Sequence, residues 1–312
     1  MTVHLFSLRD FNILYRNRHD SVFFDTTLLL TRGPLLVQGA LLSYLAPSLG
    51  IYTCVGKDEK GSKESILGQV IHNTSSNFSH LTFLSPSKAI NSQATLKVIE
   101  FLVKTAGAKG ATRMLADVEE NHPAFDILRR LSFATYTRQR IWRVNKENLS
   151  DSTDSVWQPA LNQDGNKIRS LYHNLVPGLV QQVEPFPLNN PQGMIFKKDG
   201  ELMAYVELKY GPRGIWAQPF VHPDTQNVSG ILNNLVVNIP YRRSRPIYIC
   251  VRSYQFWLEN SLETLGAEPG PIQAIVVKHL AISQKAKQSF EMPAIEGRHP
   301  EVTASIQSSK GK

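Results

Sequence analysis

Short apolar or alternating runs recur along the first half of the chain, with polar turns between them. Four runs have the character of β-strands, at residues 3–8, 50–57, 66–73 and 78–85. A helix is then predicted from one apolar stripe closed by Gly107 and Gly110, formed by Leu96, Ile99, Leu102, Val103 and Ala106. A strand over 112–119, a helix opening at Pro123 and a strand over 135–144 follow.

The second half repeats that order after a predicted hairpin over 193–211. The expected elements are a strand, a helix, a strand, a helix and a strand, at residues 214–223, 228–240, 246–253, 255–267 and 272–281. In each half, helices alternate with strands that follow a hairpin. This pattern predicts an α/β (α+β) chain with two mixed, mostly antiparallel sheets flanked by helices.

Polar segments set the expected domain boundaries. We place an N-terminal domain at 1–147, a linker rich in Ser, Asp and Asn at 148–165, and a C-terminal domain at 166–283. Residues 284–312 lack apolar periodicity and are expected to form a disordered tail.

Composition narrows the class of protein. The two cysteines, Cys54 and Cys250, lie in apolar strand-like runs, so we expect reduced core residues rather than a disulfide framework or a cysteine zinc site. The net charge of +8 is spread thinly along the chain, which gives nucleic-acid binding little support. The apolar stretch 26–47 is broken at Arg32, Gly33 and Pro34, which favours two buried helical pieces over a membrane span. No secretory pattern is visible at the start, and a cytoplasmic location is expected.

Most standard chemical signatures are absent from the sequence. The loop 56–63 has glycine, lysine and serine, but not in the order that cradles phosphate, and no helix pattern follows it. The sequence has no nucleophile-elbow or paired-histidine metalloprotease motif, and its nine histidines are scattered. We therefore expect no metal site.

The segment 116–144 carries a family resemblance. A strand leads into Asn121, a short helix ends in a Ser132-Phe133 corner, and a strand with Arg140 and Trp142 follows. With the preceding helix end at 104–118, this segment resembles the closing part of the GNAT-type acyl-CoA N-acyltransferases. Residues 248–280 resemble the same fold more weakly, with Gly266 and Ala267 at the corner. The resemblance implies a tandem GNAT-like protein with two GNAT-like domains.

The resemblance also implies where an acyl-CoA is held. In this family the pyrophosphate rests on the free N–H groups of a helix start, where the helix dipole favours an anion. The implied contacts in the first half are Phe83, Leu84, Ser85, Lys88, Ser92 and Asn121. Asn121 is equally suited to capping a helix, and the two roles are compatible. The first half lacks the usual glycines in this turn, and the second half matches the pattern only in part, through Gln226 and Gly230.

A general base is expected on a strand beside the cleft. Glu119 and Glu120 are the candidates in the first half, although solvated or ion-paired carboxylates fit the same pattern. The second half offers Glu207, and Tyr205, Tyr210 and Trp216 are candidates for a pocket wall or for the core. The positions where many family members carry a proton-donating tyrosine are Leu128 and Leu262.

Two functions of different classes follow from these residues. The leading one is N-acyl transfer from acetyl-CoA or another acyl-CoA to an amine by direct attack, which needs few side chains. The alternative is a catalytically inactive GNAT-like scaffold that binds a small molecule or a protein partner, as the missing glycines and tyrosines suggest. The sequence does not identify the acceptor, the acyl chain or the oligomeric state.

Overall fold

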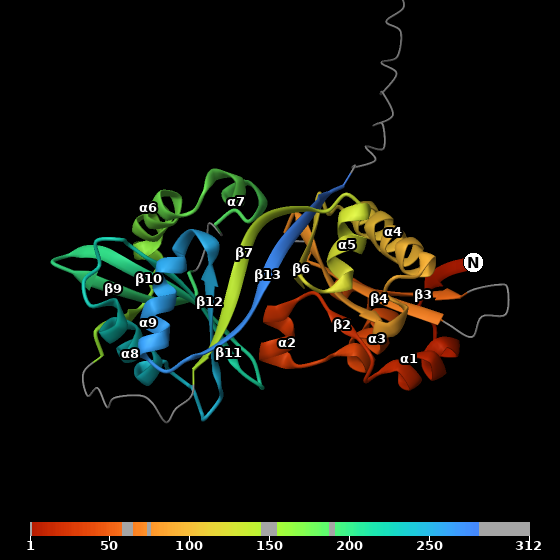
Figure 1. Cartoon of the computed structure of the whole chain (residues 1–312), viewed down its shortest axis with the longest axis horizontal. Coiled ribbons are helices and arrows are strands. Elements are labelled where there is room, and N and C mark those ends of the chain that lie inside the picture. Colours follow the sequence, from red (N-terminus) through yellow and green to blue (C-terminus); the bar gives the residue numbers. More distant parts are fainter. Residues whose placement is uncertain (1, 58–64, 74–75, 145–154, 187–190, 281–312) are drawn as a thin grey trace, which may run out of the picture. The chain divides into compact units, whose positions relative to one another are not determined.

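The structure is a computed structural model, which describes residues 2–57, 65–73, 76–144, 155–186 and 191–280 (Figure 1). The chain divides into two units, Met1–Ile282 and Ser283–Lys312, and the described residues lie in the first. The expected hairpin loop at 58–64, the first part of the expected linker and the expected tail fall outside the described residues. The domain boundaries therefore remain a prediction.

The first half, up to residue 144, places most of its predicted elements where the pattern put them. Its strands are β1 (Thr2–Leu5), β2 (Val22–Phe23), β3 (Ile51–Lys57), β4 (Ser65–His72), β5 (Phe78–Ser85), β6 (Arg113–Glu119) and β7 (Ala134–Val144). Its α-helices are α1 (Phe11–Asn17), α2 (Thr26–Arg32), α3 (Leu36–Leu45), α4 (Gln93–Ala108) and α5 (Pro123–Arg130). The break between α2 and α3 lies at Gly33, as expected from the sequence.

The second half begins at residue 155 and repeats the strand-helix alternation. Its strands are β8 (Trp157–Pro159), β9 (Gly193–Lys198), β10 (Glu201–Tyr210), β11 (Ile215–Val221), β12 (Ile247–Arg252) and β13 (Glu268–His279). Its α-helices are α6 (Gly165–Leu175), α7 (Gly178–Val183), α8 (Val228–Asn238) and α9 (Glu259–Thr264). The last predicted helix is divided into the 3-10 segment η6 (Ser253–Leu258) and α9, because Gln255 has non-helical backbone angles.

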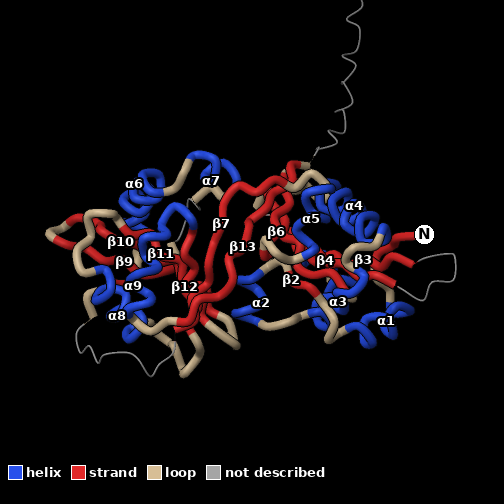
Figure 2. Tube along the Cα trace, in the orientation of Figure 1, coloured by secondary structure: helices blue, strands red, loops and turns tan. Residues whose placement is uncertain are grey.

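All described strands join one sheet, in the order β1-β3-β4-β5-β6-β13-β7-β12-β11-β10-β9-β8, with β2 paired to β5 (Figure 2). Most neighbours are antiparallel, but β5 and β6 are parallel, and so are β11 and β12. The last strands of the two halves are exchanged. Strand β13 pairs with β6 of the first half, and β7 pairs with β12 of the second. Each half is thus completed by a strand from the other.

The cores follow this exchange. In the first half, α4 and α5 pack on the sheet, and Ala274 and Val276 of β13 are buried among their side chains. In the second half, α8 and α9 pack on the sheet around Trp142 and Val144 of β7. Helix α4 begins where Ser92 accepts a hydrogen bond from the Thr95 N–H at 3.2 Å, which satisfies one unpaired donor of the first turn.

In the described residues, no single helix has the length and apolarity needed to cross a bilayer. Helices α2 and α3 reach the length and apolar composition of a membrane span only when they are taken together, and they are bent by 103° relative to each other. Both contain residues buried within the protein. Cys54 and Cys250 are buried and unpaired, as the sequence predicted, and burial raises the pKa of the Cys250 thiol to about 12.

The exchange predicts that the two halves unfold together. Trp142 belongs to the first half by sequence but is fully buried in the core of the second. Trp142→Ala is expected to cost about 3–5 kcal/mol and to lower a single calorimetric transition of the full chain. The matched control is Phe101→Ala on α4, at a partly buried position. Two transitions, only one of which moved with Trp142→Ala, would contradict the shared unfolding unit.

Candidate functional site

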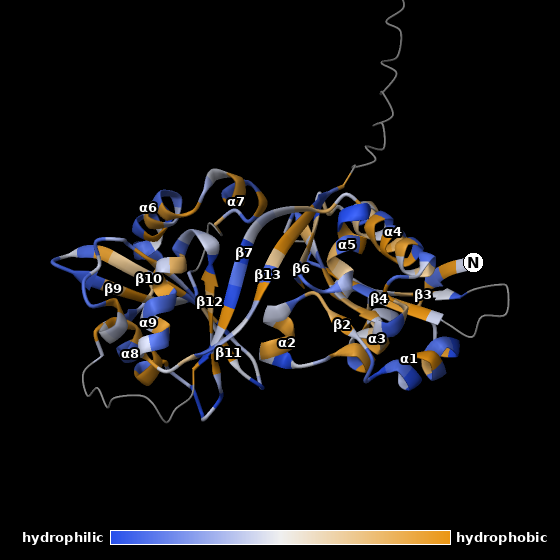
Figure 3. Cartoon of the chain, in the orientation of Figure 1, coloured by the Kyte–Doolittle hydropathy of each residue, from blue (hydrophilic) through white to orange (hydrophobic). Residues whose placement is uncertain are grey.

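A cavity of about 800 Å³ lies on one face of the sheet where the two halves meet. Both halves contribute to its wall, through strands β5 to β7 and β10 to β12 together with the α2 start and the residues after α7. Figure 3 shows that β7 is hydrophilic along its middle, beside the more hydrophobic β13. The lining residues used below are Asp25, His80, Asp117, Gln139, Tyr172, Glu184, Tyr205, Glu207, Lys209, Trp216, Gln218, Phe220 and Arg252.

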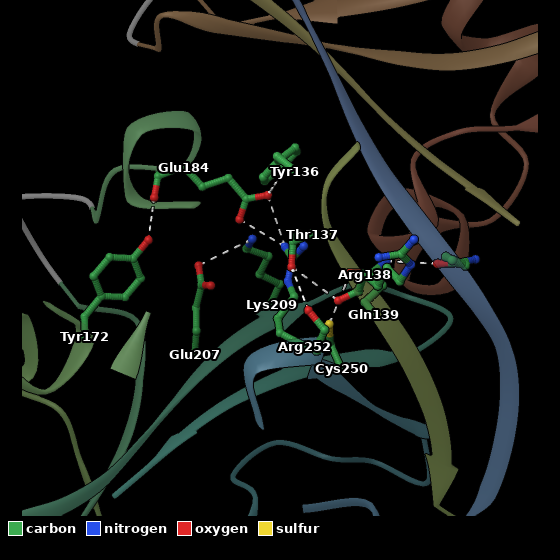
Figure 4. A network of polar contacts seen from close by, with 12 residues as sticks. Tyr136, Thr137, Arg138, Gln139, Tyr172, Glu184, Glu207, Lys209, Cys250 and Arg252 are labelled. Atoms are coloured by element: carbon green, nitrogen blue, oxygen red, sulfur yellow. Dashed lines mark hydrogen bonds and ion pairs between the residues drawn. The ribbon is translucent and has the colours of Figure 1, made fainter. Parts of the chain in front are cut away.

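A buried ion pair forms one side of the cavity (Figure 4). Arg252, only 7% exposed at the end of β12, donates from Nη2 to both oxygens of Glu184, at 3.2 and 3.0 Å. The Tyr136 hydroxyl donates to the same carboxylate. Burial opposes the charge of Glu184, but Arg252 and Tyr136 outweigh it and hold the pKa of that carboxyl below its usual range. Glu184 is therefore ionised at neutral pH.

A second pair lies on strand β10, which β11 separates from β12. The Lys209 ammonium is 3.4 Å from a Glu207 oxygen. Burial opposes the Lys209 charge, but Glu207 and Glu184 raise the pKa of Lys209 above its usual value. The Tyr172 hydroxyl donates to the main-chain carbonyl of Glu184 at 2.5 Å, which holds the residues after α7 against the cavity.

A polar chain that includes the lining residue Gln139 connects the two halves beside the cavity. The Thr26 hydroxyl and the Gln139 amide both donate to Oε1 of Gln273, at 3.1 and 2.9 Å. The Cys250 thiol donates to Oε1 of Gln139 at 3.3 Å. These bonds join α2, β13, β7 and β12, so they fix the exchanged strands to each other.

Asp117 on β6 is a carboxyl group with a raised pKa on the first-half side of the cavity. Its Oδ2 accepts a hydrogen bond from the Thr26 N–H at 3.1 Å. Burial, reinforced by the nearby Asp25 carboxylate, raises the pKa of Asp117 to about 6. A carboxyl group that titrates near neutral pH in a cavity marks a candidate functional residue.

The gap between the parallel strands β5 and β6 is filled by the chain itself. The strands pair only from Phe78 to His80, and β2 then bonds to β5 at Phe83 and Leu84. The Phe24 N–H donates to the Thr82 carbonyl, and the Phe24 carbonyl accepts from the Asp117 N–H, at 2.9 and 2.8 Å. Phe24 is fully buried.

The turn after β5 is also occupied. The Asp20 carboxylate accepts hydrogen bonds from the N–H and the hydroxyl of Ser87, with an N–O distance of 3.0 Å. Ser85 is buried and donates to the carbonyls of Asn17 and Asp20. Residues 20–24 therefore place a carboxylate at the turn and main-chain N–H and C=O groups in the gap.

The other residues expected to contact acyl-CoA in the first half are dispersed. Lys88 is exposed, and Ser92 caps α4. Asn121 lies with Glu120 in a separate hollow of about 370 Å³ at the start of α5, where His122 is the capping residue. The assignment of acyl-CoA contacts to Phe83, Leu84, Ser85, Lys88, Ser92 and Asn121 stays a prediction.

The two first-half candidates for the general base lie away from the large cavity. Glu120 forms an ion pair with Arg138 at 2.7 Å, and both side chains are about a third or more exposed. Glu119 is exposed and lines a second cavity of about 590 Å³ beside the filled gap. Their catalytic role also stays a prediction.

In the second half, a single side chain bridges the corresponding gap. Strands β11 and β12 pair from Ile215 to Ala217 and then separate. The Gln255 side chain accepts from the Val221 N–H and donates to the Pro219 carbonyl, both at 2.9 Å. At the start of α8, Asn227 accepts from the Gly230 N–H at 3.2 Å, and Lys198 donates to Gln226 at 3.0 Å.

The second-half candidates named from the sequence do meet in one place. Tyr205, Glu207 and Trp216 all line the large cavity, whereas Tyr210 lines a different, shallow pocket. Leu128 and Leu262, at the tyrosine positions of the family, are fully buried. Sequence reasoning missed Asp117, Glu184 and Arg252. A charged residue inside an apolar strand run was the available signal for Asp117 and Arg252.

No family model matches the sequence, and no curated protein is significantly similar to it. Similar solved structures do exist. One is a GCN5-related N-acetyltransferase from Sphaerobacter thermophilus, at 9% identity and a TM-score of 0.46, covering 73% of this chain and 80% of that one. Another is a GNAT-family acetyltransferase from Colwellia psychrerythraea, at 11% identity and a TM-score of 0.43, covering 89% of this chain and 100% of that one. A third is a tandem GNAT protein from the clavulanic acid biosynthesis pathway, at 10% identity and a TM-score of 0.45, covering 73% of this chain and 82% of that one.

The two halves share one order of elements. Each half has a parallel pair of strands around a helix, β5-α4-β6 and β11-α8-β12, followed by a short helix and a final antiparallel strand. This is the mixed, helix-flanked arrangement that the sequence resemblance implied. At such low identity and TM-score, the solved structures assign no residue role to this chain.

The raised pKa of Asp117 predicts a pH-dependent effect on stability. The folded state keeps the proton up to about pH 6, whereas an unfolded aspartate loses it near 3.8, so stability falls as pH rises through this window. Asp117→Asn keeps an acceptor for the Thr26 N–H and removes the charge. The variant is expected to be more stable than the wild type at pH 8, by up to about 2 kcal/mol, with little difference below pH 4.

Urea unfolding at the two pH values measures this difference, with the exposed Asp126→Asn as the control. An Asp117→Asn variant that is destabilised more at pH 8 than at pH 4 would show instead that the ionised carboxylate is paired in the folded protein.

Proposed function

We propose that the chain is an N-acyltransferase of tandem GNAT-like architecture, which transfers the acyl group of acetyl-CoA or a related acyl-CoA to an amine. We further propose that the second half binds the acyl-CoA. One observation carries this assignment. The main-chain groups in the gap between β5 and β6 are bonded by β2 and Phe24, whereas the Val221 N–H and the Pro219 carbonyl are bonded by one side-chain amide, that of Gln255.

The anion sites of the two halves support the same choice. In the first half, the Asp20 carboxylate bonds to Ser87 where a phosphate would lie, and a second anion would be repelled. In the second half, the α8 start has Lys198 beside Gln226, so a cation lies near free helix donors. The side chain of Asp224 near this turn is 85% exposed, and water screens its charge.

The large cavity adjoins the second-half gap and suits the amine. Gln218 and Phe220 of β11 and Arg252 of β12 line it, immediately beside the groups that Gln255 bonds. Glu207 pairs with Gln218 across β10 and β11, so its carboxylate lies near the end of the gap. In the proposal, Glu207 accepts a proton from the bound ammonium, which frees the nitrogen lone pair.

The thioester of acyl-CoA supplies the electrophilic carbon and the leaving thiolate. As the carbon–nitrogen bond forms, the carbon–sulfur bond breaks, and a water molecule takes the extra proton from the nitrogen and gives a proton to the departing sulfur. Leu262, fully buried at the family's tyrosine position, has no proton to give. Positioning within the cavity then contributes most of the rate enhancement.

The alternative is a GNAT-like scaffold that binds a small molecule without chemistry. The filled first-half gap supports it, because the strands there are held apart by the chain itself and leave no open groove between them. The two functions predict different responses to acetyl-CoA.

Acetyl-CoA is expected to protect only the second half from hydrogen exchange. Peptides covering 215–221 and 250–258 should gain protection, while peptides covering 20–26 and 78–85 should not change, because β2 and Phe24 already fill the gap beside β5. Ser229→Glu, in the first turn of α8, should weaken binding by about tenfold or more through charge repulsion. Gln93→Glu, in the first turn of α4, is the matched control and should have no effect.

Titration calorimetry with acetyl-CoA checks the affinities of both variants. Protection of the first-half peptides, together with loss of binding in Gln93→Glu, would place the cofactor at the first-half residues predicted from the sequence. Absence of heat and of protection at millimolar acetyl-CoA would support the scaffold.

Glu207→Gln is expected to lower turnover by about 100-fold or more, since the amide cannot accept the ammonium proton. Acetyl-CoA affinity should stay within about twofold of wild type. Release of free thiol from acetyl-CoA, measured with a panel of primary amines, gives the rate. Glu201→Gln, at an exposed position on the same strand, should behave like wild type. Unchanged turnover in Glu207→Gln would remove this residue from the proposed mechanism.

A further inference from the structure

Arg252 presents unused hydrogen-bond donors at the cavity wall. Its Nη2 atom bonds to Glu184, but Nε and Nη1 are buried and make no hydrogen bond within the described part of the chain. The indole N–H of Trp216, on the adjoining strand β11, is also buried without a partner among the described residues. Buried donors left unpaired are costly to a folded protein, and an anionic ligand group would satisfy the guanidinium.

Two carboxylates line the first-half side of the same cavity, and the charge of Arg252 lowers the pKa of one of them, Asp117. Asp25 and Asp117 both line it, and their near oxygens accept main-chain N–H groups of Leu28 and Thr26. Within the described residues, neither carboxylate forms an ion pair. The proximity of the two charges contributes to the raised pKa of Asp117, so a bound cation there would relieve a repulsion.

The spacing between these groups limits the length of the ligand. Strands β6 and β12, which carry Asp117 and Arg252, are separated by β13 and β7, a main-chain distance of about 14 Å at the usual strand spacing. Both side chains reach into the cavity and shorten the gap. Glu207, the group assigned to the reacting amine, lies on β10, on the Arg252 side.

We propose that the acceptor is an amino acid with a second cationic group at the end of a long side chain. This inference rests on the proposed function. Its carboxylate accepts a hydrogen bond from Nη1 of Arg252, its α-amino group lies at Glu207, and its distal cation lies between Asp25 and Asp117. The aromatic rings of Tyr205 and Phe220, stacked with centroids 6.0 Å apart, form part of the wall that the carbon chain contacts.

Three ligands with related carbon chains test each contact. L-lysine has all three charged groups, L-norleucine lacks the distal ammonium, and cadaverine lacks the carboxylate. Calorimetric titration of the wild-type protein without acetyl-CoA is expected to give the tightest binding for L-lysine. The other two should bind at least about tenfold more weakly, since each leaves a buried charged group unpaired. Norleucine or cadaverine binding as tightly as lysine would overturn the proposal.

Variants assign each charge to its partner. Asp117→Asn should weaken the binding of lysine and cadaverine and leave that of norleucine unchanged. Arg252→Lys should weaken the binding of lysine and norleucine and leave that of cadaverine unchanged. Asp199→Asn, at an exposed turn, is the control and should change none of them. If Arg252→Lys fails to fold, the three-ligand comparison on the wild type still decides.

The two proposals fail in different ways. Acetyl-CoA protection of the second half, combined with equal binding of the three ligands, would overturn the amino-acid class and leave acyl transfer standing. Selective lysine binding without any response to acetyl-CoA would support the ligand class in a scaffold and overturn the transfer reaction.

Discussion

The reciprocal pairing of β7 with β12 and of β13 with β6 is the constraint on which the rest of the structure depends. Main-chain hydrogen bonds cannot be left unmade inside a protein, so each half needs the other's final strand to complete its sheet. The exchange brings β6, β13, β7 and β12 side by side and makes one continuous surface from two repeats. The cavity lies on that surface. Its charged groups therefore come from segments that are distant in sequence, and neither half contains the whole set.

The two repeats have diverged at their parallel strand pairs. Where strands separate, exposed N–H and C=O groups require partners. Residues 20–24 satisfy this need in the first half with a main-chain segment and a carboxylate, which together resemble an amide-bearing chain ending in an anion. In the second half, one glutamine side chain has that role. The first closure is part of the folded core through Phe24, whereas the second consists of one side-chain amide.

The sequence was a good guide to local elements and a poor one to their partners. The apolar stripe of α4, the strand at 135–144 and the break at Gly33 depend on neighbouring residues, so pattern alone located them. The exchange of β7 and β13 depends on which edges meet in space, and alternation of side chains carries no such information. Strand β2 has only two residues and no detectable period. For the site, Tyr205, Glu207 and Trp216 were accessible from strand spacing, whereas Glu184 lies after a short helix and gave no signal.

The position of β13 has a consequence for synthesis of the chain on the ribosome. Strand β6 is complete at Glu119, but its antiparallel partner extends to His279, so the first half leaves the exit tunnel with an unpaired sheet edge. Both edges of strand β7 likewise remain unpaired until β12 and β13 have been synthesised. Exposed edges of this kind recruit foreign strands, and contacts between distant residues form slowly. The edges of β6 and β7 therefore stay open to aggregation until residues 268–279 have been synthesised.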